Sequence, residues 1–250
     1  MHHFFVRPDQ IVETDGRCRV YIRGTDVNHM KNVLRIEPGE QVLLSDGQGK
    51  DYRCRVVSLS AEEVAAEVLS EEENRELPAE LILYQGLAKG EKMEWIIQKA
   101  VELGVSRIVP MATENTVVKL EPKKEEAKRR RWQAIAESAA KQSKRSCIPE
   151  VEPVSTLSDA VKEAADSAVC FFAYEHQEGM AGTARGLSLV KAGTRIAVFI
   201  GPEGGFSEKE AQIAQKAGIC PVSLGKRILR TETAGLALLS VLMMKLELGN

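Results

Sequence analysis

A glycine-containing turn between an apolar run and a helix signal is the first place where the residue types suit chemistry. It reads Gly201-Pro202-Glu203-Gly204-Gly205, after the run 196–200 and before the helix-capping pair Ser207 and Glu210. Glycines let backbone amides approach a ligand closely, and open α/β sheets bind ligands beyond the carboxyl ends of their strands. The turn is neither a dinucleotide fingerprint nor a phosphate-binding loop with its lysine. It therefore predicts a pocket wall of another kind, although a purely structural turn also explains two adjacent glycines.

A second turn carries the ionisable side chains. It lies within 222–236, where Arg230, Thr231, Glu232 and Thr233 stand at the expected start of a helix, with either threonine as its cap. A guanidinium and a carboxylate at a helix start suit anion binding, orientation of a nucleobase or proton transfer. The alternative is that Arg230 and Glu232 only complement one another and the helix dipole.

Positive charge is concentrated in two places, although the formal net charge of the chain is only −2. Residues 119–145 hold ten Lys or Arg against four Glu, and the alternating segments 17–23 and 52–56 place arginines on one strand face. Two basic surfaces on a nearly neutral protein favour a polyanionic partner. The run 128–131 equally fits the solvated face of an amphipathic helix.

The elements that must position these groups fall into two parts. Residues 1–70 predict short strands, with one short helix that Asp26 would cap, in a small β-barrel or sheet. The acidic, proline-ended segment 71–78 predicts a linker. From residue 79 onward apolar strands alternate with helical periodicity, which predicts parallel β-α-β units in an open α/β sheet. Expected strands are 81–87, 105–111, 168–174, 195–201 and 220–224, and expected helices are 91–103, 125–145, 156–166, 207–217 and 232–247.

Composition excludes several classes of protein. The 250 residues are 44% apolar and 28% charged, as in folded globular proteins. The longest apolar stretch near the end, 235–244, is about half of the roughly 20 residues that a membrane span needs. The first residues lack the features of a secretory signal, so a cytoplasmic protein is expected. Five scattered cysteines without a C-x-x-C pair, and four histidines without ligand spacing, predict neither a disulfide framework nor a metal site.

Three motifs in order resemble the ribosomal RNA small subunit methyltransferase E family. They are GEKMEWIIQKAVELGV at 90–105, IGPEGG at 200–205 and LGKRILRTETA at 224–234. The segment HMKNVLR at 29–35 also fits, so the resemblance covers essentially the whole chain. Three separated motifs are far more specific than any one of them.

The resemblance implies a fold and a reaction that periodicity does not. It implies a PUA-like RNA-binding β-barrel over 1–70 and, over 79–250, a SPOUT-type α/β domain with a deep trefoil knot, an exception to ordinary connection rules. It also implies a homodimer that binds S-adenosylmethionine. Its substrate would be 16S ribosomal RNA, within the assembled 30S subunit, where it would methylate N3 of one specific uridine.

The resemblance also assigns the cofactor residues, whereas the catalytic and RNA-contact residues are hypotheses from their chemistry and charge. Expected cofactor residues are Ile200, Gly201, Pro202, Glu203, Gly204, Gly205, Leu224, Gly225, Arg227, Ile228, Leu229, Thr233 and Ala234. Loss of the N3 proton requires a base, for which Glu232 is the first candidate and Glu203 the second, while Arg230 would stabilise the developing charge. Expected RNA contacts are Arg7, Arg17, Arg19, Arg23, Arg35, Arg53, Lys141 and Arg145.

Two other classes of function remain as alternatives. A non-catalytic RNA-binding or assembly factor on the same scaffold would keep the arginines but would not need both glycine-containing loops. A nucleotide-binding oxidoreductase is disfavoured because no dinucleotide fingerprint follows the first strand of the α/β part.

Overall fold

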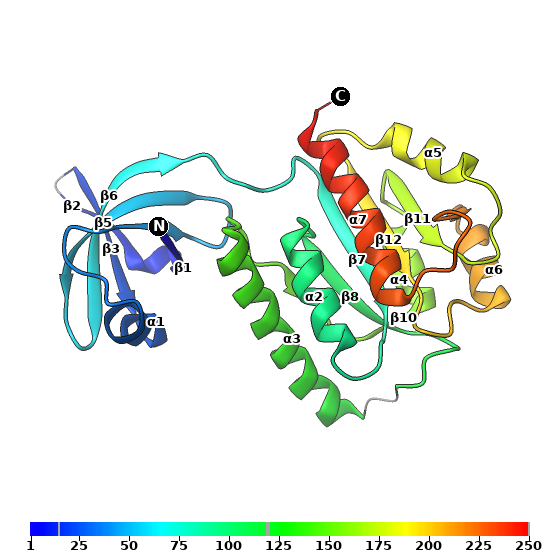
Figure 1. The fold of residues 1–250 in the computed structure, drawn as a ribbon, viewed down its shortest axis with the longest axis horizontal. Coiled ribbons are helices and arrows are strands. Elements are labelled where there is room, and N and C mark those ends of the chain that lie inside the picture. Colours follow the sequence, from blue (N-terminus) through cyan, green and yellow to red (C-terminus); the bar gives the residue numbers. More distant parts are fainter. Residues whose placement is uncertain (15, 119–120, 250) are drawn as a thin grey trace. The chain divides into compact units, whose positions relative to one another are not determined.

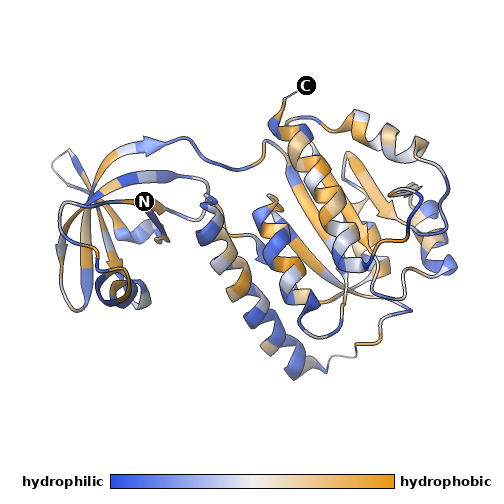
Figure 2. Ribbon diagram, in the orientation of Figure 1, coloured by the Kyte–Doolittle hydropathy of each residue, from blue (hydrophilic) through white to orange (hydrophobic). Residues whose placement is uncertain are grey.

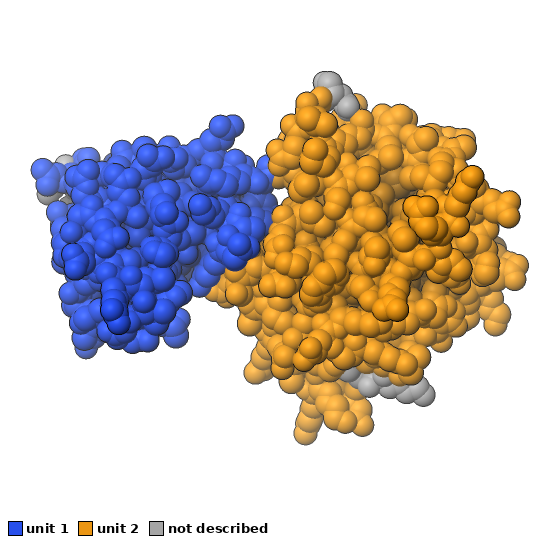
Figure 3. Space-filling model, viewed as in Figure 1, with its two compact units in different colours: residues 1–76, 140–148 blue, residues 77–139, 149–250 orange. Residues whose placement is uncertain are grey.

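The computed structural model describes residues 1–14, 16–118 and 121–249, so Lys119, the first residue of the basic stretch, lies outside it. The chain forms two compact units, which Figure 3 colours separately. Unit 1 contains residues 1–76 and 140–148, and unit 2 contains residues 77–139 and 149–250. The sequence predicted a first domain of residues 1–70 that is followed by a linker at 71–78. It did not predict that residues 140–148 also belong to the first unit.

Unit 1 is built on a six-stranded sheet. Its strands are β1 (His2–Phe5), β2 (Ile11–Thr14), β3 (Arg17–Arg23), β4 (Gln41–Ser45), β5 (Asp51–Leu59) and β6 (Glu63–Glu72). The spatial order is β1-β4-β5-β6-β3-β2, with β1 parallel to β4 and the other pairs antiparallel. The predicted alternation is confirmed, because Val20, Ile22, Cys54 and Val56 are buried while the neighbouring arginines are exposed.

Two local predictions for unit 1 are wrong. The short helix α1 (Thr25–Asn28) begins after Gly24, so Asp26 is its second residue and not its cap. A single-turn π-helix, His29–Val33, continues it, and a 3₁₀ turn, Pro8–Gln10, precedes β2. The strand β6 extends to Glu72, so the first two residues of the predicted linker belong to the sheet.

Unit 2 contains the predicted parallel sheet. Its strands are β7 (Glu80–Gly86), β8 (Arg107–Ala112), β9 (Glu150–Val151), β10 (Ser155–Thr156), β11 (Val169–Ala173), β12 (Arg195–Ile200) and β13 (Pro221–Val222). The order is β10-β8-β7-β12-β11-β13, with β9 also beside β8, and every pair is parallel. The two-residue strands β9 and β10 were not predicted because they are too short to show a period.

Six helices follow β7 in the described residues. They are α2 (Lys92–Glu102), α3 (Pro122–Ser143), α4 (Leu157–Ala164), α5 (Ala181–Leu189), α6 (Glu208–Lys216) and α7 (Thr231–Glu247). The end of α3, from Ala140 onward, belongs to unit 1. The sequence did not predict α5, whose two glycines weaken the helical signal. Gly186 is needed there, because a Cβ at that position would lie 2.6 Å from the Phe171 ring.

Alternate residues of each central strand pack into two different layers. Ile82, Tyr84 and Phe199 belong to a cluster with residues of α4 and α6. On the other face, α2 and α7 pack against each other and α7 packs on β12, as Figure 1 shows. Figure 2 shows that the strands and α7 are mainly hydrophobic. No helix in the described part of the chain is long and apolar enough to cross a membrane.

Candidate active site

A cavity of about 420 Å³ opens in unit 2 beyond the carboxyl ends of β11, β12 and β13. The first turns of α2 and α7 complete its wall. Its lining consists of Lys92, Ala173, Tyr174, Glu175, Ile200, Gly201, Pro202, Glu203, Gly205, Phe206, Ser223, Leu224, Gly225, Lys226, Arg227, Ile228, Leu229, Arg230, Thr231, Glu232 and Ala234. Both turns identified in the sequence therefore meet at one site, where open α/β sheets bind ligands.

The first turn has its shape because other backbone segments approach it closely. A Cβ on Gly86, the last residue of β7, would lie 2.5 Å from the backbone nitrogen of Pro202. Gly205 has φ +65°, a conformation that favours glycine, and its missing Cβ would lie 3.1 Å from Glu175 Oε1. The structural role and the binding role of these glycines are therefore compatible, because Gly201 and Gly205 form the turn and also line the cavity.

The outer side of this turn is fixed by a loop that follows β8. The Asn115 side-chain amide donates to the Gly204 carbonyl at 2.9 Å, and Glu210 Oε1 accepts from the Glu114 amide at 2.9 Å. The predicted capping box is confirmed, because Ser207 accepts from the Glu210 amide and Glu210 Oε2 accepts from the Ser207 amide. The glycine turn is thus held between a capped helix and a second loop.

The second turn is tied to the first by a buried chain of hydrogen bonds. Gln85 Nε2 donates to Thr231 Oγ1 at 2.9 Å, and Thr231 Oγ1 donates to the Gly201 carbonyl at 2.6 Å. Gln85 and Thr231 are both buried. The N-cap of α7 is Arg230, so the prediction that Thr231 or Thr233 caps this helix is wrong. Thr231 instead turns inward and joins the two loops.

Two carboxylates and one ammonium lie together at the cavity wall. Lys92 Nζ is 3.3 Å from Glu203 Oε1 and 3.7 Å from Glu232 Oε2. Glu232 Oε2 is buried and has no hydrogen-bond partner among the described residues. A carboxylate oxygen in that state is suited to accept a proton from a bound group.

Glu203 has different surroundings. Desolvation raises its pKa, but hydrogen bonds from the Lys89 amide and its own amide, together with Lys92, outweigh desolvation and leave the pKa below its usual value. The Lys89 amide donates to Glu203 Oε1 at 3.0 Å. Glu203 Oε1 is thus already occupied by the Lys89 amide and Lys92. Glu232 Oε2 has no hydrogen-bond partner among the described residues, so the geometry favours Glu232 over Glu203 as the base.

Most of the predicted cofactor residues line the cavity, and Arg230 and Glu232 stand at its wall with them. Two predicted residues do not. Gly204 faces Asn115 instead, and a Cβ added to Gly204 would lie 2.9 Å from the Cβ of Asn115. Thr233 is exposed on α7 and is not part of the cavity lining.

The predicted RNA-contact residues of unit 1 fall into two groups. Carboxylates pair with three of them: Arg7 is 2.9 Å from Asp9, Arg23 is 2.7 Å from Glu63 and Arg53 is 3.0 Å from Glu72. These partners neutralise part of the positive face. Arg17, Arg19 and Arg35 are exposed as well.

Arg145 does not suit the predicted RNA contact. It is only 4% exposed, and its guanidinium pairs with Glu76 inside unit 1. The Glu76 carboxylate also accepts from the amides of Ser146 and Cys147, so Arg145 completes an internal cluster. Lys141 is half-buried and lies 3.4 Å from Asp26. A count of local charge could not distinguish these residues from the exposed arginines.

Sequence reasoning also missed several residues of the cavity wall. Tyr174 and Glu175 follow β11 directly, and Lys92 begins the helix after β7. The rule that placed the two loops beyond strand ends would have identified these three positions as well. No sequence signal marked Gln85, which acts through Thr231 from the end of a buried strand. Among the described residues, no three His, Cys, Asp or Glu side chains are grouped to hold a metal ion.

Family models match most of the chain. An RNA methyltransferase domain model matches residues 75–243, and an RNA methyltransferase PUA domain model matches residues 22–69. The two matches correspond in order to an N-terminal RNA-associated domain and a C-terminal methyltransferase domain.

Known relatives agree with this match. The chain is 37% identical to ribosomal RNA small subunit methyltransferase E of Bacillus subtilis (strain 168), over 91% of this chain and 90% of that protein. It is 33% identical to the protein of the same name from Synechocystis, over 93% of this chain and 74% of that protein. A crystal structure of a ribosomal RNA small subunit methyltransferase E from Neisseria gonorrhoeae bound to S-adenosyl methionine has a TM-score of 0.81 and 33% identity, covering 96% of this chain and 95% of that chain.

Proposed function

Because the chain belongs to the ribosomal RNA small subunit methyltransferase E family, we propose that it transfers a methyl group from S-adenosylmethionine to N3 of one uridine in 16S ribosomal RNA. The observation that carries the proposal is the meeting of both glycine-containing turns with Glu232 and Arg230 around one cavity. A non-catalytic RNA-binding factor would need the arginines of unit 1 but not this cavity.

The cavity fits the cofactor in size and charge. A volume of about 420 Å³ lies within the range of small-molecule sites. The lining holds three carboxylates, from Glu175, Glu203 and Glu232, and four cationic side chains, from Lys92, Lys226, Arg227 and Arg230. Charges of both signs suit a ligand that has a positive sulfonium, a positive amino group and a negative carboxylate. When bound, S-adenosylmethionine supplies an electrophilic methyl group. The residues that would hold it are those of 200–203 and 224–229, together with Gly205 and Ala234.

The chain's own residues then account for the remaining chemistry. Uridine N3 carries a proton at neutral pH, and the N3–H bond must break before the nitrogen can attack. Glu232 takes the proton; the nitrogen pair forms the bond to the methyl carbon, and the pair of the broken carbon–sulfur bond goes to sulfur. Arg230 stabilises the negative charge that develops on the uracil oxygens. The walls of the cavity contribute by fixing the two reacting atoms in line.

RNA binding is proposed for the exposed arginines of unit 1. The slope of the logarithm of RNA affinity against the logarithm of salt concentration measures how many phosphates are neutralised. Replacing both Arg17 and Arg19 with Gln is expected to make this slope shallower by about two, one for each lost phosphate contact. Arg17 and Arg19 occupy the exposed face of β3, where they remain accessible to a phosphate backbone. The measurement is RNA affinity against salt concentration.

The control for this experiment keeps the charge. Replacing the same two arginines with Lys is expected to leave the slope close to that of the unaltered chain, because lysine also neutralises a phosphate. An unchanged slope in the glutamine variant would place the RNA surface elsewhere.

A homodimer is proposed on the exposed face of α7. Ala237, Val241, Met244 and Leu248 recur on one side of this helix, and the last three are 47%, 51% and 76% exposed. Trp95 on α2, the helix that packs against α7, is 46% exposed. An exposed apolar stripe of this kind is typical of an interface between subunits.

Charged substitutions test this interface. Val241→Glu combined with Met244→Glu is expected to convert dimers to monomers in light scattering, because two carboxylates would be buried without partners. The control is Ile213→Glu on α6, since Ile213 is 41% exposed outside the stripe. Retention of the dimer by the double variant would rule out this face.

Other features complete the proposal. The deep trefoil knot of a SPOUT-type domain is proposed from the match of the RNA methyltransferase domain model over residues 75–243. Closure of the unit 1 sheet into a PUA-like barrel is supported by the PUA domain match over 22–69. We also propose action on the 30S subunit and a cytoplasmic location.

Calorimetry separates this proposal from its alternatives. We expect binding of S-adenosylmethionine but not of NAD or ATP, because neither glycine-containing turn is a dinucleotide or phosphate-loop fingerprint. Binding of NAD in its place would favour an oxidoreductase, and binding of none of the three would favour a non-catalytic RNA-binding factor.

A further inference from the structure

Lys92 occupies a position that its own helix does not explain. It is the first residue of α2, where the positive end of the helix dipole disfavours a cation. Lys99, by contrast, stands in the last turn of the same helix, where a cation is favoured, and pairs locally with Glu102 at 2.8 Å. The placement of Lys92 therefore has to be explained by groups outside α2.

Those groups are the two carboxylates of the cavity wall, which come from different segments. Glu203 lies in the turn after β12, and Glu232 lies in the first turn of α7. Lys92 Nζ lies between them, 3.3 Å from Glu203 Oε1 and 3.7 Å from Glu232 Oε2. The Lys89 amide also donates to Glu203 Oε1, so the Glu203 carboxylate is held in place independently of Lys92.

The Glu232 carboxylate, by contrast, is held by Lys92. Its Oε2 atom is buried without a hydrogen-bond partner in the described part of the chain, so the ammonium is the nearest positive group recorded for it. Other charged side chains around the same cavity are Glu175, Lys226, Arg227 and Arg230. Without Lys92, two partly desolvated carboxylates would face each other and repel.

We propose that Lys92 is the positioning residue of the methyl-transfer site. Its ammonium, anchored on Glu203, holds the Glu232 carboxylate in the orientation in which it takes the N3 proton. This inference rests on the proposed function, because it assigns to Lys92 a role in the proton transfer made by Glu232. Lys92 itself exchanges no proton and forms no bond in the reaction.

The test is a set of variants on one helix. Lys92→Met is expected to lower kcat by about 10- to 100-fold, because displacement of a catalytic group by about 1 Å costs rates of that order. Lys92→Arg keeps the positive charge and is expected to stay within about fivefold of the unaltered chain. Lys99→Met removes a lysine that contacts neither carboxylate and is expected to leave kcat unchanged.

Two further readouts separate positioning from a purely structural role. The affinity for S-adenosylmethionine, measured by calorimetry, is expected to change less than about threefold in Lys92→Met, because the cofactor loops keep their hydrogen bonds. Lys92→Met combined with Glu203→Gln is expected to recover part of the lost rate, because it removes the opposing charge along with the ammonium. Melting temperature confirms that each variant is folded.

The outcomes distinguish the two proposals. Full activity of Lys92→Met, or a loss of cofactor affinity as large as its loss of kcat, would overturn the positioning role alone. Failure of the unaltered chain to transfer any methyl group would overturn the proposed function and this inference together.

Discussion

Replacing Glu232 with Gln is expected to lower the rate of methyl transfer by about 10²- to 10⁴-fold. Glutamine has nearly the same size and retains an oxygen, but its amide does not accept the N3 proton. The position at the start of α7 and the wall of the cavity are kept. S-adenosylmethionine affinity is therefore expected to stay within about threefold, and single-turnover kinetics beside calorimetry would measure the two effects separately.

Two other carboxylates serve as comparisons for this variant. Glu247→Gln, at the far end of α7, is expected to have no effect on the rate. Glu203→Gln is expected to cost less than Glu232→Gln, because Glu203 Oε1 already accepts from the Lys89 amide and faces Lys92. Glu232 Oε2, by contrast, has no hydrogen-bond partner among the described residues. A Glu232→Gln variant with normal turnover would place the base elsewhere, and a larger loss in Glu203→Gln would reverse the assignment.

Replacing Gly86 with Ala is expected to weaken S-adenosylmethionine binding by at least about 100-fold. The added Cβ would lie 2.5 Å from the Pro202 nitrogen and 2.9 Å from the Gly201 carbonyl carbon, so backbone has to move. The atoms that move belong to the turn that lines the cavity. Because core backbone is closely packed, the shift is transmitted to the ligand site and is not absorbed locally. Calorimetry would measure the loss of affinity.

A second glycine of unit 2 provides the matched control. A Cβ on Gly182, in α5, would lie 3.6 Å from its nearest neighbour, an ordinary contact. Gly182→Ala is therefore expected to bind the cofactor normally. Normal binding by a folded Gly86→Ala variant would show that the 201–205 turn is not the cofactor wall.

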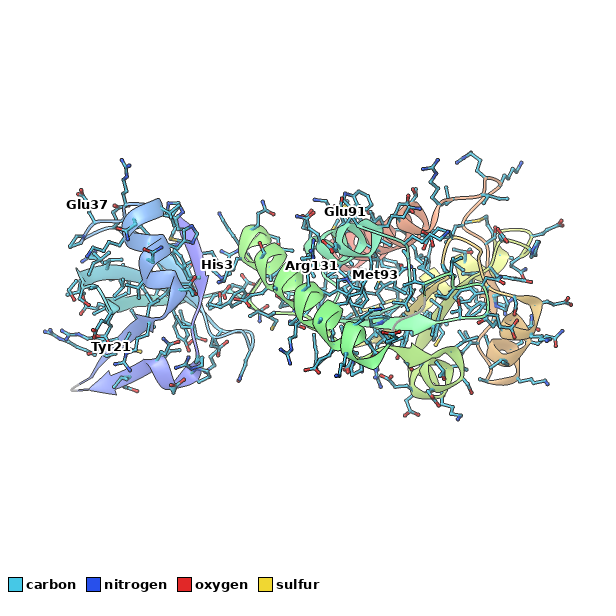
Figure 4. All side chains as sticks on the ribbon, turned by 90° about the horizontal axis from the view of Figure 1, so that it is seen from below. His3, Tyr21, Glu37, Glu91, Met93 and Arg131 are labelled. Carbon is cyan, nitrogen blue, oxygen red and sulfur yellow. The ribbon has the colours of Figure 1, made fainter. Side chains whose placement is uncertain are left out.

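Local patterns in the sequence predicted the scaffold well. The spacing of Met93, Ile96, Ile97, Ala100 and Val101 predicted a helix at 91–103, and the structure places all five in the core on α2, where Figure 4 labels Met93. Apolar runs predicted the four longer strands of unit 2, the two-residue strand β13 and the hairpin-free parallel pairing. These features depend on neighbouring residues, so a single sequence contains the information.

The contacts that organise the site were beyond such patterns. Gln85 and Thr231 are 146 residues apart in the chain but share a hydrogen bond. Lys92 likewise meets two carboxylates from other parts of the chain, and Arg131 on α3, which Figure 4 labels, pairs with Glu94 on α2. Hydrophobic periodicity determines which residues are buried, but it does not specify which distant polar groups meet. Arg145 was misassigned for this reason, since its partner Glu76 is distant in sequence.

The measurement that tests the account most directly is methyl transfer to RNA. The protein would be incubated with labelled S-adenosylmethionine and either small ribosomal subunits lacking the modification or naked 16S RNA, and the RNA digested to nucleosides. Labelled N3-methyluridine is expected, with more product from subunits than from naked RNA. A label in another nucleoside, or no transfer to either RNA by a protein that binds the cofactor, would contradict the proposed function.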